Sequence, residues 1–469
     1  IRKNEITTNH EGDYIIEDAI KDSLKRLIMP SIEREIRGDL TEKAENHAID
    51  VFSENLRNLL LQPPLKGKQI LGVDPAFRTG CKLAVINPFG TFVAKGVMYP
   101  HPPINKKADA EKIFVKFVKD YDVELIAIGN GTASRETEQF VASMIQEHHL
   151  KVQFIIVNEA GASVYSASEV ARTEFPDFQV EERSAVSIGR RVQDPLSELV
   201  KIDPKSIGVG QYQHDVNQKA LEAALTFVVE TAVNQVGVDV NTASRSLLQY
   251  VSGLSPTIAQ NIINYREENG AIKHNNDIAK VKRLGAKTFE QSIGFLRIVD
   301  GSEPLDNTSI HPESYRATYQ LLNEINMKAE DLGTEDLKSA LNHLNIAEMA
   351  EKLNIGQPTL EDILKSLIAP NRDPRDEFET PILKSDVLSI EDLAKNMKLS
   401  GTVRNVVDFG AFVDIGVKQD GLVHVSKLSK KFVKNPMDIV SVGDIVDVWI
   451  LDIDDKKGKV SLTMIDPHG

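Results

Sequence analysis

The stretch Ile70–Val73 constrains the fold most, because its successive apolar side chains require cover on both faces. Strands of this kind lie inside sheets that are covered by helices. Two more β-type runs follow at about 81–87 and 91–97, broken by Gly and Pro. Helix, strand, helix and strand patterns then alternate as far as Val157. The sequence therefore predicts one α/β domain over residues 67–203.

Three strands followed by helix, strand, helix and strand is the order of the ribonuclease-H-like fold. Asp74 ends the first strand, Glu159 follows the last, and Asp194 begins a helix. Because open α/β sheets place their chemistry at strand C-termini, we expect these carboxylates to converge. Such oxygen ligands suit Mg²⁺, and paired ions can polarise a phosphodiester. A magnesium-dependent nuclease is thus one hypothesis; the other is that Asp194 merely caps a helix before Pro195.

A second motif in this domain is the loop 129–134, which reads Gly-Asn-Gly-Thr-Ala-Ser between a strand and a helix. It imitates the G-x-G-x-x-G loop that binds dinucleotides, and Glu159 stands where a ribose-binding acid would. The third glycine is replaced by Ser134, however, and the loop does not follow the first strand of the sheet. A tight turn with a helix cap at Thr132 or Ser134 is the alternative.

Residues 240–304 carry two short helix–turn–helix units about thirty residues apart. The first turn contains Gly253 and the second Gly285, and both units resemble helix-hairpin-helix modules. Such turns present backbone N–H groups to a phosphate, independently of base sequence. Lys282 and Lys287 lie beside the second turn and would add attraction for a polyanion. Packing against a neighbouring domain is the other interpretation.

Residues 396–469 change to alternating β patterns that predict a small closed barrel of the OB kind. The segments 407–414 and 420–426 resemble the RNA-binding OB domain that is repeated in the largest small-subunit ribosomal protein. That resemblance implies a shared outer face for Phe409, Phe412 and His424, on which bases can stack. Lysines that could hold the nucleic-acid backbone are Lys427, Lys430, Lys431 and Lys434. The competing interpretation turns both phenylalanines into the core, and Trp449 is expected to be a core residue.

The remaining segments are helical by pattern. We expect helices over 1–66 with an interruption at Pro30, a connecting helix within 204–239, and a helical linker domain over 305–395. None of these carries a recognisable chemical motif. The linker helices could instead dock on the transcription or translation machinery, which would make the chain a scaffold.

Charge and composition limit the possible classes. The net charge of −14 argues against general polyanion binding, but local patches can still bind nucleic acid. Cys81 is the single cysteine, so no internal disulfide or cysteine-based zinc site is possible, which fits a cytoplasmic protein. The sequence has no apolar run of 18 residues, so we expect no membrane partner. Because the sequence begins with Ile1 and not Met, we expect it to be a piece of a longer protein. We also expect it to be a monomer.

Taken together, these modules resemble the Tex family of bacterial transcription accessory proteins. Residues 72–80 look like the opening motif of YqgF domains, which are relatives of Holliday-junction resolvases. Resolvases carry an acid after the fourth strand, where this chain has Asn130. The resemblance implies a protein that binds RNA and DNA, with RNA polymerase or a ribosome as candidate partners. It favours a binding protein without a cofactor over a nuclease, which would require Mg²⁺.

Overall fold

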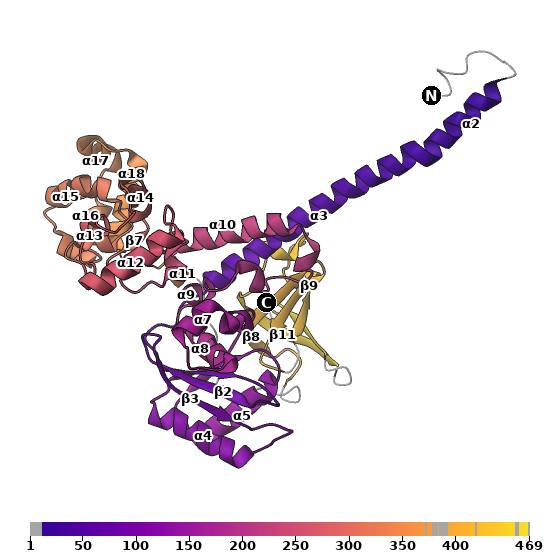
Figure 1. Cartoon of the computed structure of the whole chain (residues 1–469), viewed down its shortest axis with the longest axis horizontal. Helices are drawn as coiled ribbons and strands as arrows, with labels where there is room; N and C mark the ends of the chain where they lie inside the picture. The colour runs from indigo at the N-terminus through magenta and orange to yellow at the C-terminus, as the bar shows by residue number, and fades with distance from the viewer. Residues whose placement is uncertain are drawn as a thin grey trace.

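The computed structural model describes residues 12–370, 373–377, 383, 393–417, 420–454 and 459–467. Figure 1 shows an α/β domain, a C-terminal barrel and a helical region, with the long N-terminal helix projecting away from them. The α/β domain and the C-terminal barrel lie next to each other, and both contact the end of helix α3 (Met29–Leu60). Helix α10 (Gln218–Val236) runs from this pair to a separate helical region. In the part of the chain that is described, no helix is long and apolar enough to cross a membrane.

The α/β domain is built on a five-stranded sheet with the order β3-β2-β1-β4-β5. The first three strands are antiparallel, and β4 and β5 are parallel to β1. This topology confirms the ribonuclease-H-like prediction. The strands are β1 Ile70–Asp74, β2 Cys81–Ile86, β3 Phe92–Met98, β4 Leu125–Gly129 and β5 Gln153–Val157.

Helices cover both faces of this sheet, as the buried pattern of β1 requires. On one face, α4 (Lys107–Asp120) and α5 (Ser134–Glu147) pack Phe114 and Phe140 against the strands. On the other face lies α8 (Val180–Gln193). The approach is so close at Gly72 that a Cβ there would lie 2.2 Å from the Ala185 carbonyl oxygen. Glycine is therefore necessary in the central strand.

Shorter helices lead out of the sheet. They are α6 Ala162–Ala167, α7 Glu169–Glu174 and α9 Pro195–Leu199. Asp194 caps α9, because its Oδ1 accepts a hydrogen bond from the Ser197 N–H at 3.1 Å.

The N-terminal helix forms one rod: α2 (Asp13–Ser23), a π-helical turn (Leu24–Ile28) and α3 (Met29–Leu60). The predicted interruption at Pro30 is therefore wrong. The wider turn just before Pro30 is a local bulge of the kind that accommodates a missing N–H donor. The first part of the rod projects away from the body, and burial in α3 begins only at Ile49. The connecting helix α10 (Gln218–Val236) packs beside the buried end.

The helical region begins with four helices that form the predicted pair of hairpins. They are α11 Arg245–Leu248, α12 Pro256–Asn269, α13 Asn275–Ile278 and α14 Ala286–Ile293. Two short parallel strands, β6 (Val238–Asp239) and β7 (Leu296–Arg297), pair across the ends of this unit. A second core then holds α15 Tyr315–Glu324, α16 Glu335–Asn342, α17 Ile346–Leu353 and α18 Gln357–Ile368.

The C-terminal domain is a closed five-stranded barrel with the order β10-β12-β11-β8-β9, which confirms the OB prediction. The strands are β8 Lys398–Val407, β9 Gly410–Asp414, β10 Gly421–His424, β11 Ile445–Asp454 and β12 Lys459–Thr463. The prediction that Trp449 is a core residue is wrong. Its neighbours Val448 and Ile450 point inward, so Trp449 lies half-buried outside, with the Lys398 ammonium 5.4 Å from its ring.

Candidate nucleic-acid interface

The outer face of strands β9 and β10 carries the aromatic residues that the sequence singled out. Phe412 pairs with Leu422, and Gly410 pairs with His424. Alternation along a strand places these four residues on one face. The intervening Ala411, Val413 and Val423 are fully buried in the barrel core. Phe412 is half-buried and His424 is exposed, so neither side chain belongs to the core.

Phe409 lies in the turn between β8 and β9 and is 51% exposed. Its ring meets that of Phe412 edge-on, with centroids 6.2 Å apart. The Phe409 carbonyl accepts a hydrogen bond from the Val425 N–H at 2.8 Å, which ties the turn to the end of β10. Phe409, Phe412 and His424, hereafter the aromatic face, thus form a supported surface that is open to solvent.

Exposed cations follow this face in the segment after β10. Lys427, Lys430 and Lys431 are all exposed. Phe432, which the sequence analysis overlooked, follows Lys431 directly and is 93% exposed. An aromatic residue flanked by lysines in a polar loop was the available signal for this position. Such a ring costs free energy in water and offers another stacking surface beside the cations.

The two hairpins share one burial pattern. Val251 and Leu254 in the first correspond to Val281 and Leu284 in the second, and all four are buried. The residues between them are exposed in both turns. Gly253 adopts φ +84° in the first turn, and Arg283 takes the equivalent position at φ +65° in the second. The turn geometry is therefore the same in both units although one glycine is replaced.

The hairpins differ at the start of the following helix. In the first, Ser255 caps α12 by accepting a hydrogen bond from the Ile258 N–H at 3.3 Å. In the second, Gly285 occupies the cap position and offers no side chain to the N–H groups of α14. Lys282 and Lys287 flank this second turn and are exposed. The second hairpin is thus better arranged than the first to receive a phosphate oxygen.

The sheet edge brings together two of the three predicted carboxylates. Burial and the charge of Glu159 together raise the pKa of Asp74 to about 6, against the opposing effect of a hydrogen bond from Ser184. Burial also raises the pKa of Glu159, against the Gly131 N–H and the charge of Arg191. Asp74 and Glu159 are called the acidic edge below.

The prediction that Asp194 converges with these two acids is wrong. The adjacent Gln193 bonds through Nε2 to the carbonyls of Lys68 at 3.0 Å and Asn87 at 2.7 Å, which lie at the opposite end of β1 and β2. Asp194 instead accepts a hydrogen bond from the Arg375 guanidinium at 2.7 Å. Because α8 runs antiparallel to β1, the residue after its C-terminus lies far from Asp74. Glu181 and Ser184, in the first turns of α8, approach Asp74 in its place, and the sequence analysis missed both.

Glu159 fills the loop that imitates a dinucleotide site. A Cβ on Gly131 would lie 1.6 Å from Glu159 Oε1, and one on Gly129 would lie 2.4 Å from Oε2. The glycines of this loop therefore make room for a carboxylate of the protein itself. Glu159 Oε2 is buried, and no described group hydrogen-bonds to it. A pyrophosphate would have to displace this side chain, so the geometry favours a packing role for the loop.

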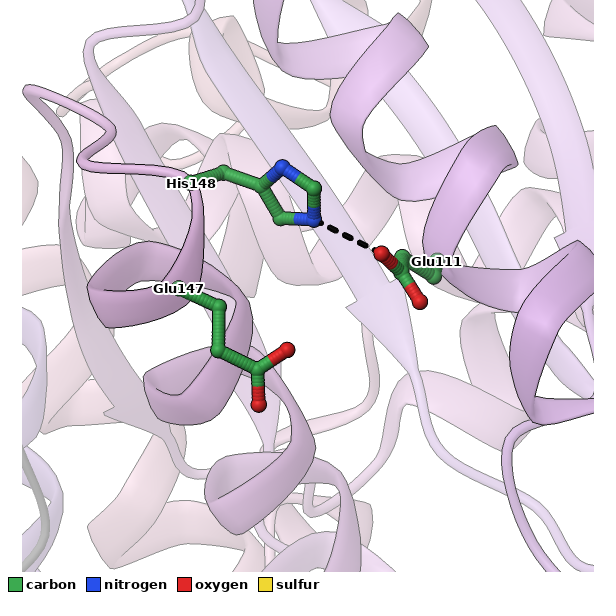
Figure 2. A group of neighbouring side chains, drawn as sticks. All are labelled: Glu111, Glu147 and His148. Carbon is green, nitrogen blue, oxygen red and sulfur yellow. Dashed lines mark hydrogen bonds and ion pairs between the residues drawn. The ribbon is translucent and has the colours of Figure 1, made fainter.

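A separate group of potential metal ligands lies on helices α4 and α5. Figure 2 shows His148 directed at Glu111, with 2.9 Å between His148 Nε2 and Glu111 Oε1. One donor atom each from Glu111, Glu147 and His148 lies within 4.8 Å of the others. Nitrogen and carboxylate ligands of this kind are the ones that Zn²⁺ uses. All three residues are partly or fully exposed, and neither member of the acidic edge belongs to this group.

The arrangement defines a class of protein: a ribonuclease-H-like domain combined with helix-hairpin-helix units and a closed barrel of the OB kind. Comparison with protein families supports each part. Residues 68–193 match the Tex protein YqgF-like domain, 233–297 the helix-hairpin-helix motif, 303–375 an HHH domain and 392–465 the S1 RNA binding domain.

Relatives match nearly the whole chain. "Uncharacterized protein YdcI" of Bacillus subtilis is 61% identical over 99% of this chain and 64% of its own length. "Protein tex" of Bordetella pertussis is 50% identical over 93% of this chain and 55% of its own length. "Transcriptional accessory protein Tex" of Neisseria gonorrhoeae is 46% identical over 97% of this chain and 59% of its own length. The chain belongs to the Tex family, and it spans 55–64% of the length of these relatives.

Proposed function

We propose that this chain is the nucleic-acid-binding part of a transcription accessory factor, and that it binds RNA or DNA largely without sequence specificity. The S1 barrel supplies stacking surfaces for single-stranded bases, and the second hairpin supplies phosphate contacts. The observation that carries the proposal is the aromatic face, where Phe409, Phe412 and His424 lie together outside the barrel core. Stacking on such rings tolerates any base, because every base has a π-face.

The proposed partners follow from this role. We propose RNA and DNA as ligands, and RNA polymerase or the ribosome as the machinery on which the helical region docks. A cytoplasmic location and a monomeric state complete the proposal. The net charge of −14 means that attraction to nucleic acid depends on local groups such as Lys427, Lys430 and Lys431.

The test is a titration of labelled RNA, single-stranded DNA and duplex DNA of one length at one salt concentration. We expect single strands to bind through the barrel and duplex to bind through the hairpins, so the two ligands should respond to different substitutions. Little difference among base sequences is expected within each class. Absence of binding to all three ligands at low salt would contradict the proposal.

A magnesium-dependent nuclease is the second candidate, because burial and Glu159 raise the pKa of Asp74 to about 6, a perturbation typical of functional carboxylates. Asn130 at the tip of β4 and the displaced Asp194 leave this edge poor in ligands for two ions. Incubation of single-stranded, duplex and junction substrates with Mg²⁺ separates the candidates. Cleavage by the wild type that is lost in Asp74→Asn would establish the nuclease. Equal, trace cleavage by the wild type and the variant would exclude it.

A further inference from the structure

A polar groove lies between the barrel and the α/β domain, with a volume of about 530 Å³. It is hereafter the interdomain groove. Its polar lining includes Asn130, Asn158, Arg135, Gln211, Arg404 and Asn405. Asn130 and Asn158 directly follow strands β4 and β5, and Arg135 lies in the first turn of α5. Gln211 comes from the loop before α10, and the last two belong to β8. Amide and guanidinium groups thus reach the groove from both domains.

The groove continues the outer face of the barrel. Asn405 on β8 pairs directly with Phe412 on β9, so the two side chains are neighbours on that face. The adjacent Arg404 lies at an irregularity in the pairing, between Val403 and Asn405. A strand that leaves the ring of Phe412 along this face therefore meets Asn405 first and then Arg404.

The floor of the groove presents arginines above buried acids. Arg404 Nη2 donates to Asp414 Oδ2 at 2.6 Å, and Arg135 Nη2 lies 3.8 Å from Asp414 Oδ1 across the domain boundary. Arg135 also bonds to Glu138 at 3.0 Å. The arginine side chains are 27–28% exposed, whereas those of Glu138 and Asp414 are 1% and 6% exposed. The acids thus fix the guanidinium groups, which carry five N–H donors each, at the surface.

Two amides are oriented in a similar way. Asn158 Oδ1 accepts a hydrogen bond from the Ala160 N–H at 2.9 Å, and Asn130 Oδ1 accepts one from the Glu159 N–H at 3.1 Å. Because the main chain holds each side-chain oxygen, the NH₂ groups of these amides are directed to donate hydrogen bonds in the groove. The groove is therefore rich in donors, while its arginines are balanced by acids.

We propose that the interdomain groove binds bases of a single strand whose neighbouring bases stack on the aromatic face. This inference rests on the proposed function and extends its site. Bases suit the groove better than phosphates do, because three acids, Glu138, Asp414 and Asp420, offset the two arginines. Neutral base edges gain hydrogen bonds there without needing net positive charge. Since amide and guanidinium donors predominate, bases that present carbonyl oxygens, such as uracil, fit better than adenine.

The test measures affinity against strand length with the full chain. Oligouridylates of about 4 to 16 nucleotides cover the range that OB-type sites occupy. We expect Gln211→Ala to leave the Kd of the shortest bound strands unchanged and to weaken the longer ones about fivefold, the effect of removing about one hydrogen bond. Asn405→Ala should weaken binding by a similar factor from shorter lengths onward, because Asn405 lies next to Phe412. Oligoadenylates should show a smaller gain with length. Asn323→Ala, an exposed amide on α15, is the matched control.

The outcomes separate this inference from the proposed function. If Phe412→Ala weakens strands of every length while both groove variants bind all lengths as the wild type does, the groove is not a base site and the aromatic face stands. If no strand binds, or if Phe412→Ala has no effect, the proposed function fails and the groove proposal falls with it. An equal loss at every length in Gln211→Ala would also overturn the groove, because it would indicate a general structural effect.

Discussion

The acidic edge and the aromatic face carry the two most specific side-chain groups of the molecule, and they are built in opposite ways. Asp74 and Glu159 are drawn into the protein, where burial raises the pKa of both. The aromatic rings are instead held out, with Phe409 51% exposed beside the half-buried Phe412. The first arrangement costs free energy in the charged form, and the second leaves apolar surface in water.

The difference shows which group is prepared for a ligand. At the acidic edge, the Gly131 N–H already bonds to Glu159, and the third predicted acid is paired with Arg375 elsewhere. At the aromatic face, backbone pairing fixes the strands while the rings remain accessible. This difference supports the proposal that the barrel, rather than the acidic edge, binds nucleic acid. Four sets of substitutions test this difference between the two groups.

The largest effect is expected from Phe412→Ala. Loss of base stacking on this ring should cost about 1–3 kcal/mol, which is roughly 5- to 150-fold in the Kd for single strands. Fluorescence anisotropy with a labelled single strand measures the change, and a thermal melt checks the fold. Phe89→Ala is the control, since it removes a ring that is 90% exposed in the α/β domain. Equal affinities of Phe412→Ala and the control would refute the assigned face.

Asp74→Asn should change stability and leave nucleic-acid affinity unchanged. The folded pKa of Asp74 is raised from 3.8 to about 6, so the folded state holds the proton more tightly than the unfolded state does. The wild type should therefore lose stability as pH rises from about 4 to about 6, relative to the variant. Above that window we expect Asp74→Asn to be more stable by about 3 kcal/mol.

Urea unfolding at pH 4 and pH 8 measures this difference, with the exposed Asp300→Asn as control. A variant less stable than the wild type at pH 8 would mean that the charged Asp74 has a favourable partner. That result would contradict the view that the acidic edge is less prepared for a ligand than the aromatic face.

Gly285→Val tests the hairpin that lacks a side-chain cap. No heavy atom lies within 4 Å of a Cβ built on Gly285, so the fold should tolerate valine, while a phosphate approaching α14 should not. We expect a loss of about 1 kcal/mol, or about fivefold in the Kd for duplex DNA. Gly356→Val is a matched control, because Gly356 also caps a helix and its Cβ would make only ordinary contacts at 3.7 Å. If both variants bind duplex like the wild type, the hairpins serve packing alone.

The smallest effect is expected from Lys282→Ala and Lys287→Ala. Removing one lysine that neutralises a phosphate should reduce the slope of log K against log salt by about 0.9, with only a modest change in Kd at any one salt concentration. Titrations of duplex at several salt concentrations measure the slope. Lys280→Ala should change it less, because the Lys280 ammonium already lies 2.7 Å from Asp277. An unchanged slope in all three variants would remove this surface from the interface.

The sequence predicted the fold well wherever a local pattern determines it. The buried run at Ile70–Val73 and the alternation around Phe412 depend on neighbours in the chain, and both elements formed as expected. The predicted helix interruption at Pro30 was wrong because a π-helical turn, which sequence patterns do not indicate, accommodates the proline. The prediction that Trp449 is a core residue was wrong because the long side chain of Lys398 covers its outward-facing ring, whereas local hydropathy places the ring inside.

The candidate site was harder to predict where it depends on the direction of a helix. Asp194 follows α8, and only the antiparallel course of α8 over β1 shows that it lies at the wrong end of the sheet. For the same reason, Ser184 and Glu181 could not be matched to Asp74 from spacing. The interdomain groove joins residues as distant in sequence as Arg135 and Arg404 and has no local signature.

Photo-crosslinking identifies which residues of the protein contact a bound single strand. A single-stranded RNA carrying 5-iodouridine at successive positions is bound to the full chain, irradiated, and the linked peptides are identified by mass spectrometry. The account predicts crosslinks at Phe409, Phe412 and His424, which Phe412→Ala should reduce. Crosslinks confined to the hairpins or to peptides around Asp74 and Glu159, with the barrel unmodified, would contradict it.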